Sequence, residues 1–277
     1  MTERSIDYAA VRRYWDEAAT RAAFAAAYMA HEQGLPDDCV RYRFERERAV
    51  VDGWFGEAAG RESVLDVGCG PGTWPIHFAG RFERVVGVEQ SAKMVAAARA
   101  SLTALENVEI INADAVTLAI EGRFDCIFLG GLLMYLNRED ALALLRRLPA
   151  LLKPGGRILL RESTVRRGVE AKTGAYQVVY RATAEYEAMI RESGLVLART
   201  ERNQGYAAME TAVAIVDALR KLPSLGAREP AQVGGPVWRS LRLTEPLSLL
   251  LLPKVLEGLG VAWPHLQNHF FLVKAPA

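Results

Sequence analysis

A glycine-rich turn follows a short apolar run near residue 65, and it is the part of the sequence best suited to hold a small ligand. The segment reads Val64-Leu65-Asp66-Val67-Gly68-Cys69-Gly70-Pro71-Gly72. Glycine lets the backbone adopt conformations that other residues avoid, and it lets a ligand approach closely. An apolar run that enters such a turn is typical of a buried strand whose carboxyl end faces a ligand. Asp66 adds a carboxylate two positions before the first glycine.

The spacing of these glycines separates two kinds of ligand. Dinucleotide-binding turns need a third glycine where this sequence has Thr73. The carboxylate of Asp66 would repel a pyrophosphate, whereas it can receive a cationic amine through hydrogen bonds or water. The turn therefore favours an aminoacyl group over a diphosphate. Within it, Cys69 is interpreted as a small filling residue and not as a nucleophile.

Two further acids stand at the ends of predicted strands. Glu89 ends a β-branched run, and a carboxylate there can accept hydrogen bonds from both hydroxyls of a ribose. Asp114 follows the next run and is placed to accept a hydrogen bond from the exocyclic amine of adenine. Met94 is expected either to pack on the adenine face or to fill the core. Purely structural roles for the three acids, as turn caps or solvated side chains, stay open.

Residues 63–161 resemble the core of the class I S-adenosyl-L-methionine-dependent methyltransferases. The glycine turn matches the first motif of that family, Glu89 its ribose-binding acid and Asp114 its adenine-binding acid. Lys153-Pro154-Gly155-Gly156 matches the turn before its fifth strand. The resemblance implies S-adenosyl-L-methionine as cofactor and S-adenosyl-L-homocysteine as product, and it is much less specific for the acceptor. The cofactor-binding residues that it implies are Tyr14, Asp66, Gly68, Cys69, Gly70, Gly72, Glu89, Gln90, Met94, Asp114, Ala115, Leu129 and Gly130.

Alternating strand and helix patterns must position these residues. Strand patterns are found at 63–67, 84–88, 108–112, 124–129, 157–161 and 195–201, with helical patterns between most of them, and a last strand is expected at 268–274. The alternation predicts an α/β fold with a doubly wound, mostly parallel, seven-stranded sheet. The predicted parts are an N-terminal helical cap (1–60), a cofactor-binding core (61–204), a helical insert (205–264) and the last strand of the core (265–277).

The sequence identifies residues that could contact the methyl acceptor less clearly than those that could bind the cofactor. Tyr14-Trp15-Asp16 resembles an N-terminal aromatic element that closes over the cofactor in many small-molecule methyltransferases, although both rings would equally serve to bury a helix face. The residues that could face an acceptor are Tyr135, Glu162, Tyr176, Tyr180 and Arg181. None of them is a compelling general base. The catalytic residues are therefore left unassigned, and the protein is expected chiefly to align the reactants.

Composition and charge restrict the class of protein. The chain has 34 basic and 33 acidic residues, and this balance argues against a protein that binds nucleic acid by general electrostatic attraction. Three widely spaced cysteines and four histidines form no metal-binding pattern, so no metal is expected. Neither a leader sequence nor a membrane-spanning run is apparent, and a cytoplasmic protein is expected.

These observations predict a methyltransferase that acts on a small or medium, partly apolar organic acceptor at N, O or C. The apolar content of the insert, including Trp238, Leu249 and Trp263, predicts a lid over the acceptor. A dimer interface and a lipid-docking surface are the alternatives. Methyl transfer to RNA or protein, a non-catalytic cofactor-binding protein and a nicotinamide enzyme are the competing functions. Thr73 argues against the last of these, and whether the chain forms a homodimer or another homo-oligomer stays open.

Overall fold

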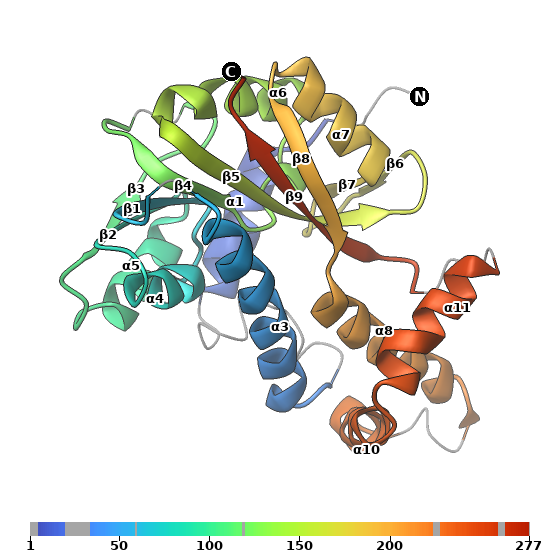
Figure 1. Cartoon of the computed structure of the whole chain (residues 1–277). Helices are drawn as coiled ribbons and strands as arrows, with labels where there is room; N and C mark the ends of the chain where they lie inside the picture. The colour runs from blue at the N-terminus through green and yellow to red at the C-terminus, as the bar shows by residue number, and fades with distance from the viewer. Residues whose placement is uncertain are drawn as a thin grey trace. The chain divides into compact units, whose positions relative to one another are not determined.

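The computed structural model describes residues 5–19, 34–58, 60–117, 120–223, 228–259 and 264–276 (Figure 1). The chain divides into two compact units: the first comprises Met1–Ala27, Asp52–Glu201 and His269–Ala277, and the second comprises Tyr28–Val51 and Arg202–Asn268. Residues 20–33 of the predicted cap, and Trp263 of the predicted insert, lie outside the described residues. The boundaries expected at 60, 204 and 264 stay predictions.

A largely parallel sheet organises the first unit. Its central strands pair in the order β3-β2-β1-β4-β5, all in parallel. They are β1 (Ser63–Val67), β2 (Arg84–Glu89), β3 (Val108–Asn112), β4 (Phe124–Leu129) and β5 (Leu152–Val165). The predicted α/β, doubly wound arrangement is thus confirmed. In this register Asp66 lies beside Gly87 of β2 and Phe128 of β4, so the carboxyl ends of the three strands meet at one edge.

The sheet has nine strands, and the prediction of seven was wrong. The other four are β6 (Val169–Lys172), β7 (Val178–Ala182), β8 (Val196–Arg202) and β9 (Gln267–Lys274). β7 pairs in parallel with the end of β5, β6 pairs antiparallel with β7, and β9 pairs with β5 and β8. The unexpected strands are β6 and β7. All four residues of β6 are exposed, so it lacks the alternation that marks a half-buried strand in a sequence.

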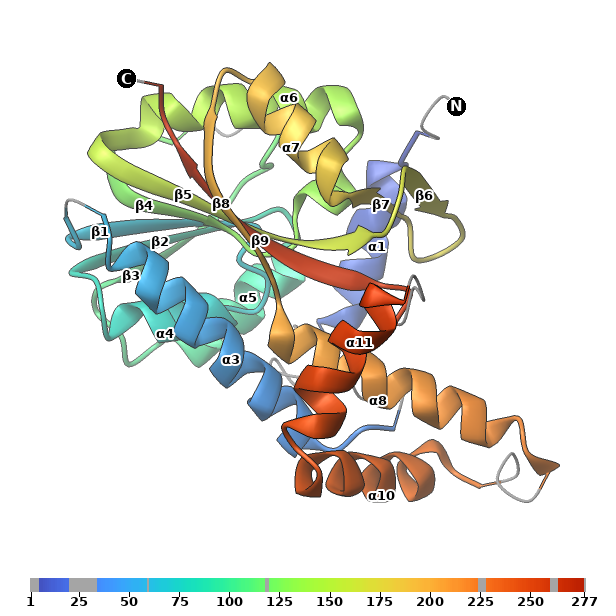
Figure 2. The ribbon, with the colours of Figure 1, turned by 45° about the vertical axis from the view of Figure 1, so that its right-hand side comes forward.

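Helices cover both faces of this sheet (Figures 1 and 2). α6 (Arg138–Arg147) and α7 (Thr183–Glu192) lie on one side, and α4 (Thr73–Ala79) and α5 (Ala92–Ser101) lie on the other. Leu65 and Leu129 belong to the core under α6 and α7, whereas the ring of Phe128 lies 4.7 Å from that of Trp74 in α4. Strands covered on both faces read as continuous apolar runs. Asp66 is the one charged residue in β1, and this makes it conspicuous.

The N-terminal helix α1 (Tyr8–Ala18) belongs to the same unit. Asp7 caps it by accepting hydrogen bonds from the N–H groups of Ala9 and Ala10. At its other end, Ala18 packs against Met94 of α5. Ser91 caps α5, since its Oγ accepts a hydrogen bond from the N–H of Met94 at 3.1 Å, and the same hydroxyl donates to Asp16 of α1. α1 is therefore fastened to the helix that follows Glu89.

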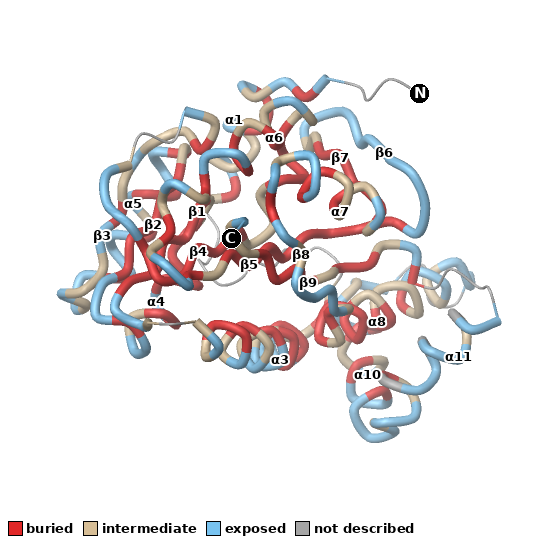
Figure 3. Tube along the Cα trace, turned by 45° about the horizontal axis from the view of Figure 1, so that its top comes forward, coloured by how far each residue is buried: buried red, intermediate tan, exposed pale blue. Residues whose placement is uncertain are grey.

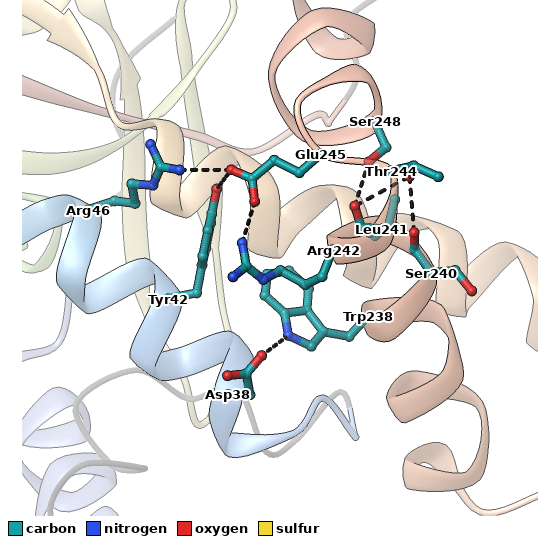
Figure 4. Close-up of polar contacts among 10 residues, drawn as sticks. All are labelled: Asp38, Tyr42, Arg46, Trp238, Ser240, Leu241, Arg242, Thr244, Glu245 and Ser248. Atoms are coloured by element: carbon teal, nitrogen blue, oxygen red, sulfur yellow. Dashed lines mark hydrogen bonds and ion pairs between the residues drawn. The ribbon is translucent and has the colours of Figure 1, made fainter.

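The second unit is helical. It contains most of α3 (Asp37–Phe55), α8 (Gln204–Arg220), α10 (Pro230–Leu243), the short π-helix η4 (Leu247–Leu251) and α11 (Leu252–Gly258). Glu245 accepts hydrogen bonds from Tyr42 at 2.8 Å and Arg46 at 2.7 Å, and it also pairs with Arg242 (Figure 4). Trp238 donates its indole N–H to Asp38 at 2.8 Å. In the part of the chain that is described, no helix is both long and apolar enough to cross a bilayer.

Candidate active site

Asp66 is the most unusual polar residue at the carboxyl edge of the sheet. It is 1% exposed, and neither carboxylate oxygen has a hydrogen-bond partner among the described residues. Burial raises its pKa well above the ordinary range, the nearby carboxylate of Glu89 raises it further, and Arg161 lowers it. A buried carboxylate without partners is costly, and native proteins rarely retain one without a reason. The two oxygens can accept hydrogen bonds from an ammonium group of a ligand.

The turn after β1 brings backbone close to Asp66. The N–H groups of Gly68 and Cys69 donate to the carbonyl of Val88, which ties the turn to β2. Gly72 has a φ of +89°, and a Cβ there would lie 3.0 Å from Leu102 and 3.3 Å from Ala98. This position therefore needs glycine both for its backbone conformation and for the close approach of α5.

Glu89 lies at the end of β2, in contact with the same turn. Its Oε2 accepts a hydrogen bond from the N–H of Gly70 at 3.1 Å, and its Oε1 accepts one from the N–H of Ser91 at 2.8 Å. Burial raises its pKa, and these backbone hydrogen bonds oppose the shift. Each carboxylate oxygen can accept more than one hydrogen bond, so the side chain is held in place and can still receive ribose hydroxyls.

The other residues predicted to bind the cofactor lie at or after the ends of β2, β3 and β4. Gln90 is partly buried directly after Glu89, and Met94 is 1% exposed against α1. Asp114 is partly buried after β3 and accepts a hydrogen bond from the N–H of Val116 at 2.8 Å, which shapes its own loop. Ala115 is buried in the core beneath α6. At the next strand, Leu129 ends β4 beside Val67, and Gly130 follows it at the same edge.

Four aromatic rings from three segments of the chain gather near the turn that follows β4. Tyr14 lies 4.9 Å from Tyr176, and Trp15 lies 5.6 Å from Tyr135, measured between ring centroids. The hydroxyls of Tyr135 and Tyr176 are 3.0 Å apart and share a hydrogen bond. Burial raises the pKa of both phenols well above the ordinary value. In the ligand-free protein both are therefore neutral hydroxyl groups near neutral pH.

Glu162 and Arg181 were predicted to face an acceptor together with Tyr135 and Tyr176, but they do not belong to this aromatic group. Glu162 on β5 is fully buried and accepts hydrogen bonds from the N–H groups of Leu132, Leu133 and Met134, at 3.0, 2.9 and 3.3 Å. Arg181 on β7 donates to the carbonyls of Leu133 and Leu136, at 2.8 Å each. Both side chains thus hold η2 (Leu133–Tyr135), the turn that carries Tyr135. Tyr180 is buried on β7, with Lys172 over its ring at 5.4 Å.

Arg161 is a further residue at this edge of the sheet and was not predicted from the sequence. The register pairs Asp66 with Phe128 and Phe128 with Leu159, so Arg161, two residues further along β5, is on the same face of the sheet as Asp66. It is 6% exposed and donates to the carbonyl of Gly130 at 3.1 Å. Its positive charge favours the ionised form of Asp66. The parity of positions along parallel strands is the signal that could have found it.

Comparison with known proteins agrees with this geometry. A family model described as a methyltransferase domain matches residues 64–156. A demethylmenaquinone methyltransferase from Lactococcus lactis is 34% identical over 108 residues, which are 37% of this chain and 42% of that protein. The chain therefore matches less than half the length of this relative.

Solved structures share the fold. A complex of DhpI with SAH has a TM-score of 0.55 and 21% identity, covering 70% of this chain and 90% of that one. The [4+2]-cyclase SpnF has a TM-score of 0.57 and 17% identity, covering 83% and 82%. Because a cyclase shares the fold, the fold by itself does not determine the reaction. Residues 64–156 of this chain match the methyltransferase domain model, and they include the glycine turn, Asp66, Glu89 and Asp114.

Proposed function

We propose that this protein transfers a methyl group from S-adenosyl-L-methionine to a small or medium, partly apolar organic acceptor. The observation that carries the proposal is the buried Asp66, whose two oxygens have no partner among the described residues beside the glycine turn. The donor set fits the cofactor. Asp66 would hold its ammonium group, Glu89 its ribose hydroxyls, and Asp114 its adenine amine. The structure of DhpI with SAH and the methyltransferase-named relative support the same assignment.

When bound, the sulfonium centre supplies an electrophilic methyl carbon. The protein's own part is to hold the reactants in line and to exclude water, and such alignment can lower a barrier by about 7–11 kcal/mol. Tyr135 and Tyr176 are neutral phenols joined by a hydrogen bond, so their hydroxyls can donate to a polar atom of the acceptor. The ring of Trp15 beside Tyr135 makes this region suited to a partly apolar molecule.

The acceptor is proposed only as a chemical class. The L. lactis relative is named for demethylmenaquinone, which supports a small-molecule acceptor, but the match covers 42% of that protein. A lid formed by residues 205–264, as expected from the sequence, stays a prediction.

The proposal is tested by incubating the protein with methyl-labelled S-adenosylmethionine and a panel of apolar amines, phenols and quinols. Label is expected in one class of acceptor, together with stoichiometric S-adenosylhomocysteine. Asp66→Asn should lose this turnover, and Glu109→Gln, which changes an exposed acid on β3, should retain it. If the protein binds the cofactor but labels only RNA or protein, the acceptor class is wrong. If it binds only NADH, the cofactor assignment is wrong.

A further inference from the structure

Asp66 and Arg161 carry groups of opposite charge on one face of the sheet. Asp66 lies on β1 and Arg161 on β5, with β4 between them, and the three strands are buried around these positions (Figure 3). Asp66 pairs in register with Phe128, and Phe128 pairs with Leu159, two residues before Arg161. Parallel strands lie about 4.8 Å apart and rise about 3.3 Å per residue, so the two Cα atoms are separated by about 10 Å across the sheet and about 7 Å along it.

The side chain of Arg161 covers part of this distance. Its Nη1 donates a hydrogen bond to the carbonyl of Gly130 at 3.1 Å, in the turn that follows β4. At Gly131, which has a φ of +91°, a Cβ would lie 3.3 Å from the same nitrogen, so glycine keeps a side chain of this turn away from the guanidinium. The guanidinium therefore lies against backbone at the carboxyl edge of β4, the strand that adjoins β1.

The two groups do not close into an ion pair. Asp66 is 1% exposed, and neither of its oxygens has a hydrogen-bond partner among the described residues. Burial and Glu89 raise the pKa of Asp66 and Arg161 lowers it, so the two side chains are near enough to interact. Opposite charges that are removed from water are stable only when they pair well and their hydrogen bonds are satisfied. A buried carboxyl group and a guanidinium that are held apart can instead receive a ligand that carries both signs.

The other acids near this edge have hydrogen-bond donors of their own. Glu89 accepts hydrogen bonds from two backbone N–H groups, and Glu162 accepts them from three. Asp16 of α1 accepts one from a serine hydroxyl. Successive residues of a strand point to opposite faces, so Glu162 faces away from Arg161. The acid that a ligand would complete is therefore Asp66.

We propose that Arg161 binds the carboxylate of the cofactor's aminoacyl group while Asp66 binds its ammonium group. This inference rests on the proposed function, since the aminoacyl group belongs to S-adenosylmethionine. An α-amino acid group carries both charges on one carbon, and a guanidinium holds a carboxylate with charge-assisted hydrogen bonds. The two side chains together select a zwitterion over a simple amine.

The test is calorimetric titration of the full-length protein with ligands that differ in these two charges. S-adenosylhomocysteine carries both, decarboxylated S-adenosylhomocysteine keeps the amine alone, and methylthioadenosine has neither. The wild type should bind the first about tenfold more tightly than the second, or better, because the second cannot form the charge-assisted contact with Arg161. Arg161→Met should reduce this preference to about twofold or less by weakening S-adenosylhomocysteine alone, and Arg161→Lys, which keeps the charge, should restore part of it. Asp66→Asn should weaken both amine ligands and leave methylthioadenosine unchanged.

Arg157→Met is the matched control. Arg157 lies on the same face of β5, toward its other end, and also donates to backbone carbonyls, those of Gly155 and Gly156. Its variant should keep the wild-type preference for the carboxylate.

Circular dichroism checks the fold of each variant, and the wild-type comparison of the two amine ligands decides the proposal if Arg161→Met does not fold. The proposal is overturned if the wild type binds both amine ligands equally. It is also overturned if Arg161→Met weakens both by the same factor, because Arg161 would then only hold the turn at Gly130. If the wild type binds none of the three ligands, the proposed function fails as well.

Discussion

Glu162 and Arg181 hold the same turn through opposite backbone groups. Glu162 accepts hydrogen bonds from the N–H groups of Leu132, Leu133 and Met134, and Arg181 donates to the carbonyls of Leu133 and Leu136. The two side chains come from β5 and β7, which pair near their ends. The short 3-10 turn η2 is thereby held by side chains from two strands. Its conformation in turn places the hydroxyl of Tyr135 against Tyr176.

This arrangement predicts a graded effect of substitutions at Glu162. Glu162→Gln keeps an oxygen for two of the three N–H groups but turns its NH2 toward the N–H of Met134, so it should cost less than removal of the whole side chain. Glu162→Ala leaves all three N–H groups without this acceptor and should lower the free energy of unfolding by about 1–3 kcal/mol or more. Arg181→Met should have a similar effect. Denaturant titration of the single and double variants measures these changes, and simple additivity of Glu162→Ala and Arg181→Met would contradict the shared turn.

The buried Asp66 predicts a pH dependence of stability in the ligand-free protein. Burial and Glu89 raise its folded-state pKa, so the folded protein binds more protons than the unfolded one. The stability linked to this residue is fully present below the ordinary pKa of 3.8 and is lost as pH rises through the folded pKa. The midpoint temperature of thermal unfolding should therefore decline less between acidic and neutral pH in Asp66→Asn than in the wild type. Equal slopes would mean that Asp66 is ionised freely in the folded protein.

The two buried phenols predict an unusual spectrophotometric titration. Tyr135 and Tyr176 should remain protonated at pH values where exposed tyrosines ionise, because burial raises their pKa. The double variant Tyr135→Phe, Tyr176→Phe should thus give the same phenolate absorbance as the wild type up to about pH 11. A loss of two titrating groups in that range would show that these phenols ionise normally and could serve as bases.

Glycine at position 72 should be needed for the stability of the folded protein. Gly72→Ala combines a left-handed φ of +89° with close contacts to Leu102 and Ala98, and we expect a loss of about 1–3 kcal/mol in unfolding free energy. Gly80→Ala is the matched control, since its φ is −82° and a Cβ there meets no atom within 4 Å. Chemical denaturation of both variants decides the point, and equal stabilities would count against the strained turn.

The parts of the site that were predicted from sequence are local ones. The glycine turn, Asp66 and Glu89 lie where a strand ends and a turn begins, and at such places glycine spacing and the end of an apolar run are visible in the chain. Arg161 and the contacts of Glu162 and Arg181 were not predicted. The hydrogen bonds of those three side chains join residues 28 to 48 positions apart, and only the pairing of β4, β5 and β7 brings them together. Strand β6 could not be predicted either, because its exposed residues show no apolar alternation and its position in the sheet is set by pairing with β7.

The central claim is that Asp66 receives the ammonium group of an aminoacyl nucleoside. Calorimetric titration of S-adenosylhomocysteine into the wild type, Asp66→Asn and Glu109→Gln tests it most directly. We expect Asp66→Asn to bind about tenfold more weakly or worse, Glu109→Gln to match the wild type, and NADH to give no binding heat. Unchanged affinity in a folded Asp66→Asn protein, or binding of NADH alone, would contradict the account.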